Sequence, residues 1–209
     1  SVTLVPSRYV ARACPGSEVF ANWVSGVSTA LDHSVGDRRL RVGYLGRLTP
    51  SKGIATLCSA MSVLNADEVA YDLVIGGEPV FASDEERTEV EESLKQVSSF
   101  STRLGWTTPD QLFGSIDMLV VPSIAPESFG LVVAEAMSAR IPVIVSDAGA
   151  LAEVVGGESY PYIVSAGQPL DLAAAIRSLG EELRENSSDL AERTSELFWR
   201  WQENYSPEA

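Results

Sequence analysis

Two clusters of charged and small residues follow apolar runs of the chain, and both could contact an anion. The first is GRLTPSKG at 46–53, which begins at Gly46 and places Arg47 and Lys52 five residues apart. Two cations in one turn can face the same phosphate group. The alternative is a surface turn whose two charged side chains are solvated.

The second cluster is PSIAPESFGL at 122–131. Ser128 is a favoured N-cap residue, so the spacing predicts a helix that begins directly after it. The amides of Phe129, Gly130 and Leu131 would then be unpaired. Unpaired amides and the partial positive charge of a helix start bind anions, and glycine allows close approach.

Two glutamates flank this predicted helix start. Glu127 comes directly before it, and Glu135 lies one to two turns inside the helix. Carboxylates accept hydrogen bonds from sugar hydroxyls. The alternatives are a favourable charge near a helix N-terminus for Glu127 and a solvated helical side chain for Glu135. The apolar neighbours Val132, Val133 and Ala136 argue against solvation of Glu135.

The elements that position these residues alternate between strand and helix from residue 41 onward. Runs rich in Val, Ile and Leu alternate with helical patterns, as in βαβ units around a parallel sheet. The predicted strands span 41–45, 71–75, 102–104, 117–121, 142–146 and 160–164, and the predicted helices span 51–64, 84–97, 109–113, 129–139, 150–155, 171–183 and 188–204. The prediction is an α/β fold, a Rossmann-like parallel sheet with helices on both faces. Ligands of such sheets gather at the carboxyl ends of the strands.

The two ends of the chain depart from this pattern. Strands are predicted at 2–5 and 19–24, around a short helix at 7–14. The domain prediction is a remnant of another domain with its linker at 1–30, a ligand-binding domain at 31–186 and a C-terminal crossover helix at 187–209. Apolar residues of that helix are expected to be partly exposed and to favour self-association, among them Phe198, Trp199 and Trp201.

The composition excludes several classes of partner. The net charge of −14 repels nucleic acid and anionic membrane surfaces, although a local cation cluster can still bind a small anion. No apolar run is long enough to span a bilayer, and two cysteines do not make a disulfide framework. We therefore expect a cytoplasmic protein that contacts neither nucleic acid nor membrane.

Other chemistries find little support. The chain has no G-x-S-x-G elbow, no G-x-G-x-x-G fingerprint and no CxxC pair. His33, the single histidine, stands in a polar stretch that is typical of a solvated side chain. An Asp-x-Asp motif is also missing, so neither a metal nor a cofactor is implied.

Taken together, the motifs resemble those of a known enzyme family. Gly-Arg-Leu-x-x-x-Lys-Gly at 46–53 is followed by Pro-Glu-Ser-Phe-Gly-Leu at 126–131, with a second glutamate eight residues after the first. Glu-Ala-Met at 135–137 and Pro-Val-Ile at 142–144 complete the pattern. Residues 41–155 thereby resemble the group 1 (family 4) retaining glycosyltransferases.

The resemblance implies one half of a GT-B fold, in which two Rossmann-like halves face each other across a cleft. The implied half is the C-terminal, donor-binding one, whose partners are a nucleotide sugar and a missing N-terminal acceptor domain. By the same resemblance, Arg47 and Lys52 bind the diphosphate, Glu127 the transferred sugar and Glu135 the ribose. The donor-binding set also includes Gly46, Gly77, Gly105, Trp106, Ser128, Phe129, Gly130 and Leu131, with Gly105 and Trp106 at the base.

Some residues depart from the family pattern. Ser25 and Ser28 stand in the motif SGVS where Asn-Gly-Val-Asp is usual, Glu78 follows Gly77 where a second glycine is common, and Arg140 replaces another glycine at a predicted helix end. The function expected is retaining transfer of a hexose-like group, which the isolated chain would not complete. Two alternatives remain open: a nucleotide-sugar-binding module without catalysis, and a GT-B nucleotide-sugar epimerase.

Overall fold

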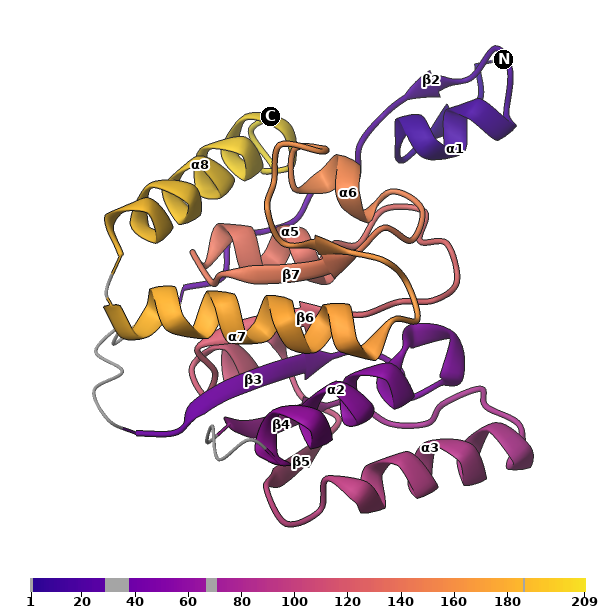
Figure 1. Ribbon diagram of the computed structural model, residues 1–209. Helices are drawn as coiled ribbons and strands as arrows, with labels where there is room; N and C mark the ends of the chain where they lie inside the picture. The colour runs from indigo at the N-terminus through magenta and orange to yellow at the C-terminus, as the bar shows by residue number, and fades with distance from the viewer. Residues whose placement is uncertain (1, 29–37, 67–70, 186) are drawn as a thin grey trace.

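A six-stranded parallel sheet with helices on both faces forms the main part of the computed structural model, which describes residues 2–28, 38–66, 71–185 and 187–209 (Figure 1). The strands are β3 (Leu40–Leu45), β4 (Tyr71–Gly76), β5 (Ser101–Gly105), β6 (Met118–Val121), β7 (Val143–Ser146) and β8 (Ile163–Val164). Their order is β5-β4-β3-β6-β7-β8, with every neighbouring pair parallel. The prediction of an α/β fold with a Rossmann-like parallel sheet and helices on both faces is confirmed.

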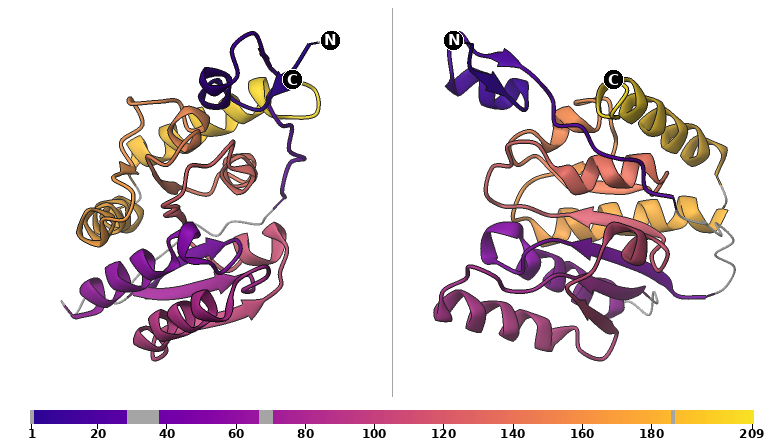
Figure 2. Two further views of the ribbon diagram at one scale, coloured as in Figure 1. Left: turned by 90° about the vertical axis from the view of Figure 1, so that its right-hand side faces the viewer. Right: turned by 180° about the vertical axis from the view of Figure 1, so that it is seen from behind.

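Helices cover the two faces of the sheet in two groups (Figure 2). One face packs against α2 (Ile54–Ala66), α3 (Asp84–Gln96) and α7 (Pro169–Glu185), and the other against α4 (Pro109–Phe113), α5 (Leu131–Ser138), α6 (Leu151–Val154) and α8 (Ser188–Asn204). All four residues of β6 and of β7 are buried, because helices cover both of their faces. Continuous apolar runs were therefore a correct signal for these strands.

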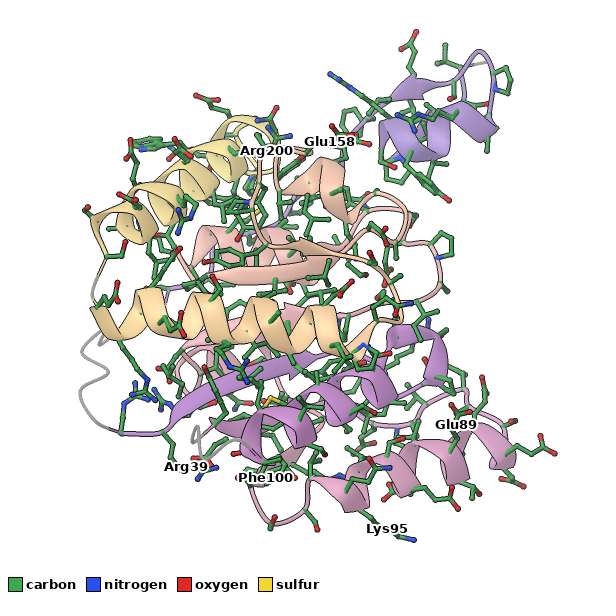
Figure 3. The ribbon with its side chains drawn as sticks, in the orientation of Figure 1. Arg39, Glu89, Lys95, Phe100, Glu158 and Arg200 are labelled. Atoms are coloured by element: carbon green, nitrogen blue, oxygen red, sulfur yellow. The ribbon has the colours of Figure 1, made fainter. Side chains whose placement is uncertain are left out.

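The charged helix α3 is largely solvated, as its composition predicts. Ser83 and Glu86 form a capping box at its start, which stabilises a helix with few buried side chains. Glu89 is exposed, and Lys95 projects from the helix away from the sheet (Figure 3). The helix is held by local capping and a narrow apolar stripe around Val90 and Leu94.

The N-terminal lobe, residues 2–19, stands apart from the main sheet (Figure 1). It consists of β1 (Leu4–Val5), α1 (Arg8–Ala13) and β2 (Glu18–Val19), with β1 parallel to β2. The strand predicted over 19–24 is wrong beyond Val19. The chain turns there toward the C-terminus, where the amide of Val24 donates to the carbonyl of Tyr205 at 2.7 Å.

The expected exposure of the last helix is correct only in part. Trp199 is 55% exposed and Phe198 is half-buried, but Trp201 is buried. The indole Nε1 of Trp201 donates to the carbonyl of Val24 at 3.1 Å, so the linker after the N-terminal lobe covers this side chain. His33, expected to be solvated, lies outside the described residues.

Candidate active site at the carboxyl edge of the sheet

The chain leaves β3 and β6 toward opposite faces of the sheet, and a cleft opens between the two departing loops. β3 continues into the short helix η1 (Pro50–Lys52) and α2, whereas β6 continues into α5 on the other face. Such a switch point is where open α/β sheets bind ligands. The cleft measures about 290 Å³, and the predicted residues that line it are Gly46, Arg47, Lys52, Glu127, Ser128, Phe129, Gly130 and Leu131.

The loop after β3 is fixed by its own backbone. The amide of Gly46 donates to the carbonyl of Gly76 at 3.0 Å, which attaches the loop to the end of β4. The buried hydroxyl of Tyr44 donates to the carbonyl of Arg47 at 2.7 Å. Arg47 therefore projects its side chain from a fixed main chain.

The position of Lys52 depends on the glycine that follows it. Gly53 ends η1 with a φ of 74°, a left-handed conformation that favours glycine. A Cβ at Gly53 would lie 1.8 Å from the carbonyl oxygen of Pro122. The absence of a side chain thus lets the first loop touch the second and brings Lys52 to the cleft.

Lys52 and Glu127 form an ion pair inside the cleft. Lys52 Nζ lies 2.5 Å from Glu127 Oε1, and the side chains are 26% and 17% exposed. The buried hydroxyl of Ser123 donates to the same oxygen at 2.6 Å, and the Ser123 carbonyl accepts a 2.6 Å hydrogen bond from Ser146 Oγ. Glu127 Oε1 accepts from both Ser123 and Lys52, so the serine fixes the carboxylate and the carboxylate in turn restrains the lysine.

The main chain of Glu127 is fixed from the end of β7. Its amide donates to the carbonyl of Ala148 at 3.3 Å, and its carbonyl accepts from the amide of Ala150 at 2.9 Å. Gly149, at φ 70°, lies between these partners, and a Cβ there would come within 2.4 Å of the Glu127 carbonyl oxygen. Three strand ends therefore contribute to the placement of one carboxylate.

The predicted N-cap at Ser128 is wrong. Helix α5 begins at Leu131 with Gly130 as N-cap, in a left-handed conformation (φ 110°, ψ 63°) that a serine would rarely adopt. The amides of Val133 and Ala134 already bind the carbonyl of Gly130. In the first turn, the amides of Leu131 and Val132 have no preceding helical carbonyl to bind. Of the three amides predicted to be free at the helix start, only that of Leu131 lies in the first turn.

The cleft carries positive charge within an acidic protein. Arg47 is exposed, and among the described residues no carboxylate forms an ion pair with it. Burial raises the pKa of Tyr44, and the nearby Glu127 carboxylate raises it further, so its hydroxyl stays a neutral donor to Arg47. The cleft therefore has a net positive charge, because two cations and the partial positive charge at the start of α5 outweigh one carboxylate. This charge favours binding of an anion.

Gly77, Gly105 and Trp106 lie at neighbouring strand ends and not among the residues that line the cleft. The amide of Gly77 donates to the carbonyl of Gly105 at 2.7 Å, and a Cβ at Gly77 would lie 1.8 Å from the Gly46 carbonyl oxygen. Trp106 is 77% exposed beside them. Backbone hydrogen bonds thus join the carboxyl ends of β3, β4 and β5 beside the cleft.

Glu135 also lies outside the cleft lining, one turn into α5. Its side chain is partly buried, and burial, with a smaller contribution from the charge of Asp110, raises the pKa of its carboxyl. The alternative of a fully solvated side chain is therefore wrong. A partly desolvated carboxylate on this helix can accept hydrogen bonds from hydroxyls.

Four further residues build the site without having been predicted. Ser123 follows a predicted strand end, so its position was a usable signal. Tyr44 lies inside a strand, and its contact with the turn could not be read from spacing. Asn22 reaches the cleft from the N-terminal segment, and Gly149 acts only through a tertiary approach to Glu127.

The described residues contain neither a cluster of metal-binding side chains nor a helix that could span a membrane. Within them, no group of three or more His, Cys, Asp and Glu side chains could hold a metal ion. Among the helices of the same part of the chain, none has both the length and the apolar character needed to cross a bilayer.

The chain is similar to known glycosyltransferases in sequence. A family model described as glycosyl transferases group 1 matches residues 32–196. Lipopolysaccharide 1,2-N-acetylglucosaminetransferase of Salmonella typhimurium is 27% identical over 75% of this chain and 42% of that protein. D-inositol 3-phosphate glycosyltransferase of Rhodococcus jostii is 31% identical over 86% of this chain and 39% of that protein. The chain spans about two fifths of the length of these relatives.

Solved structures agree on the fold. HepE of Anabaena, in complex with UDP and glucose, superposes with a TM-score of 0.82 at 21% identity, over 99% of this chain and 59% of HepE. The C-terminal domain of a glycosyl transferase group 1 family protein from Francisella tularensis superposes with a TM-score of 0.63 at 22% identity, over 80% of this chain and 87% of that domain. With a family model matched over most of its length and a 31% identical relative, this protein belongs to the group 1 glycosyltransferases.

Proposed function

We propose that the chain is the donor-binding half of a glycosyltransferase and that its cleft holds the diphosphate of a nucleoside diphosphate sugar. The observation that carries the proposal is the convergence of Arg47, Lys52 and the start of α5 on one cleft at the switch point of the sheet. A diphosphate matches this arrangement because its two anionic groups can meet both cations and the helix amides.

The same groups would assist the chemical step. As the bond between sugar and diphosphate breaks, negative charge grows on the leaving diphosphate, where the cations already lie. One charge contact at ~4 Å contributes roughly 4 kcal/mol at an effective dielectric of ~20, before desolvation is subtracted. The proposed transfer retains the anomeric configuration, and its acceptor binds outside the residues described.

Glu127 has two roles in this proposal. Its Oε1 holds Lys52 in place, which lowers the entropic cost of ordering the lysine for donor binding. The phosphate then competes for Lys52, and the carboxylate becomes available to hydroxyls of the transferred sugar. Glu135, farther along α5, is proposed to accept hydrogen bonds from the ribose.

A calorimetric screen of UDP-, GDP- and ADP-sugars, followed by product analysis, tests this function. We expect one base to bind and no transfer by the 209-residue chain alone, because transfer needs an acceptor hydroxyl held about 3 to 3.5 Å from the anomeric carbon. Exposed apolar side chains of the N-terminal lobe, such as Val2, Leu4 and Val19, favour self-association. Sedimentation should therefore accompany the assay.

The outcomes separate the alternatives. Binding without turnover supports a donor-binding half, and activity restored by an added acceptor domain would identify it as part of a transferase. Formation of an epimer would instead establish the epimerase alternative. Failure of all three nucleotide sugars to bind, or robust transfer by a strictly monomeric sample, would contradict the proposal.

A further inference from the structure

Apolar packing explains little of how the N-terminal lobe is held against the sheet domain, because its buried Val5 belongs to neither hydrophobic cluster of that domain. Its helix α1 has six residues and none of them is buried. The lobe lies beside α6 and the loop that precedes α5, and its strands pair only with each other (Figure 2). Polar contacts must therefore account for much of its attachment.

Two side chains make these contacts and satisfy the amides at the start of α1. Ser7, only 2% exposed, accepts a hydrogen bond from the amide of Val10 at 3.2 Å. The carboxylate of Glu153, on α6, accepts from the amides of Arg8 at 2.9 Å and Tyr9 at 3.0 Å. We call this pair of side chains the Ser7–Glu153 clamp.

The clamp extends into the cleft loop. The hydroxyl of Ser7 donates to the carbonyl oxygen of Ser128 at 2.7 Å, across 121 positions of sequence. Ser128 follows Glu127, whose own backbone is bound to the end of β7, and precedes the Gly130 N-cap of α5. Ser7 therefore fixes the peptide that lies between the cleft carboxylate and the helix start.

We propose that Ser7 is a positioning residue for the anion site, acting through the Ser128 carbonyl. Ser7 does not itself line the cleft, whereas Asn22, farther along the same N-terminal segment, does. The N-terminal segment is thus part of the machinery that shapes the donor loop. This inference rests on the proposed function only for the identity of the ligand, because the effect on the loop can be measured without one.

Hydrogen–deuterium exchange of the free chain tests the effect on the loop. Ser7→Ala removes the donor to Ser128, and we expect about fivefold faster exchange at the amides of Glu127, Val133 and Ala134, with β3 unchanged. Ser7→Thr, which keeps a hydroxyl, should stay within about twofold of the wild type. Glu153→Ala should reproduce the effect of Ser7→Ala, because it releases the start of α1, which Ser7 caps.

Ser17→Ala is the matched control. Ser17 lies in the same lobe, and among the described residues its buried hydroxyl has no hydrogen-bond partner, so its removal should not alter the loop. Wild-type exchange rates at 127–134 in Ser7→Ala would overturn the proposal. Equal acceleration in Ser17→Ala would also overturn it, because the effect would then be general to the lobe.

Calorimetry gives the second readout, with whichever of UDP, GDP and ADP the wild type binds and with the monophosphate of the same nucleoside. If Ser7 positions the anion site, Ser7→Ala should lower the ratio of diphosphate to monophosphate affinity about fivefold. A merely structural loss would weaken both nucleotides alike and leave the ratio unchanged, which would overturn the positioning role. Failure of the wild type to bind UDP, GDP and ADP would instead count against the proposed function, while the exchange experiment still decides the role of Ser7.

Discussion

At the scale of single residues, the ion pair of Lys52 and Glu127 is the central feature of the site. The lysine contacts a carboxylate whose binding oxygen also accepts from the buried Ser123 hydroxyl. A flexible lysine side chain normally loses rotamer entropy when it binds a ligand. Here the loss is largely complete before the ligand arrives, since the pair already restrains the ammonium group.

We predict that Lys52→Ala weakens nucleoside diphosphate binding about tenfold, a loss of about 1.4 kcal/mol, without unfolding the domain. The lysine is partly exposed and contributes little to the core. Lys95→Ala is the control, because Lys95 is an exposed cation on α3 that projects away from the sheet (Figure 3). Calorimetry measures diphosphate binding by both variants, and thermal melts measure their stability. Unchanged binding together with a large fall in melting temperature would show that Lys52 is structural.

At the scale of elements, close approach of loop backbones places the site, and glycines make that approach possible. Gly53 and Gly167 both have a φ of 74°, but only a Cβ at Gly53 would meet another backbone, at 1.8 Å from Pro122 O. At Gly167 nothing lies within 4 Å. Substitution at Gly167 therefore measures the energetic cost of the left-handed backbone alone, whereas substitution at Gly53 adds the cost of a clash with Pro122.

We predict that Gly167→Ala lowers the free energy of unfolding by about 1 kcal/mol, from the left-handed conformation alone. Gly53→Ala should lose at least about 2 kcal/mol more, because the two loops must separate. It should also weaken diphosphate binding, which Gly167→Ala should leave intact. Urea unfolding measures both losses, and equal values for the two variants would contradict the role of the loop contact.

Asp117 joins the starts of β3 and β6 at the opposite edge of the sheet. Its carboxylate accepts hydrogen bonds from the guanidinium groups of Arg38 and Arg41, and from the amide of Arg41. Burial by itself would raise the pKa of Asp117, but the hydrogen bonds from Arg38 and Arg41 lower it to about 2. The charged form is therefore the one that the fold stabilises.

A pKa below the ordinary value of 3.8 implies stability that is fully present above pH 5 and is lost as the pH falls toward 2. We predict that Asp117→Asn lowers the free energy of unfolding by about 2 kcal/mol at pH 7, and that the difference shrinks below pH 4. Asp72→Asn, which breaks only the exposed pair with Arg39, should cost less than about 1 kcal/mol. Urea titrations between pH 7 and pH 3 test this, and a pH-independent difference would contradict it.

Strands and helix starts differ in how well the sequence predicts them. The predicted strand ranges overlap all six strands of the main sheet. Apolar runs identified β6 and β7 because strands covered on both faces are apolar throughout, whereas the edge strand β5 is mostly exposed. The cap at Ser128 was wrong because a distant residue, Ser7, engages this loop and Gly130 begins the helix. A contact between residues 121 positions apart cannot be predicted from the spacing of neighbouring residues.

Arg140 was predicted in part: its position at a helix end was expected, but its contacts were not. Its place at the end of a helix was predicted, and the structure adds a φ of 57°, a left-handed conformation that favours glycine. The strained backbone is compensated by a guanidinium group 4.0 Å from the ring centroid of Phe198 and a hydrogen bond to Ser195. These partners come from α8 and could not be read from the sequence.

At the scale of the whole molecule, a small basic cleft lies within a protein of net charge −14. The surrounding field repels anions at long range, so affinity must come from short-range contacts with Arg47, Lys52 and the α5 amides. Such contacts discriminate by the number of phosphate groups. A ligand with one phosphate can satisfy only part of the site.

The most direct test compares diphosphates with monophosphates of the same nucleoside by calorimetry: UDP with UMP, GDP with GMP and ADP with AMP. We predict that the diphosphate of the preferred base binds at least about tenfold more tightly than its monophosphate, because the second phosphate meets the cations and the helix start. Lys52→Ala should reduce that ratio. Equal affinities within every pair would contradict the assignment of the cleft as a diphosphate site.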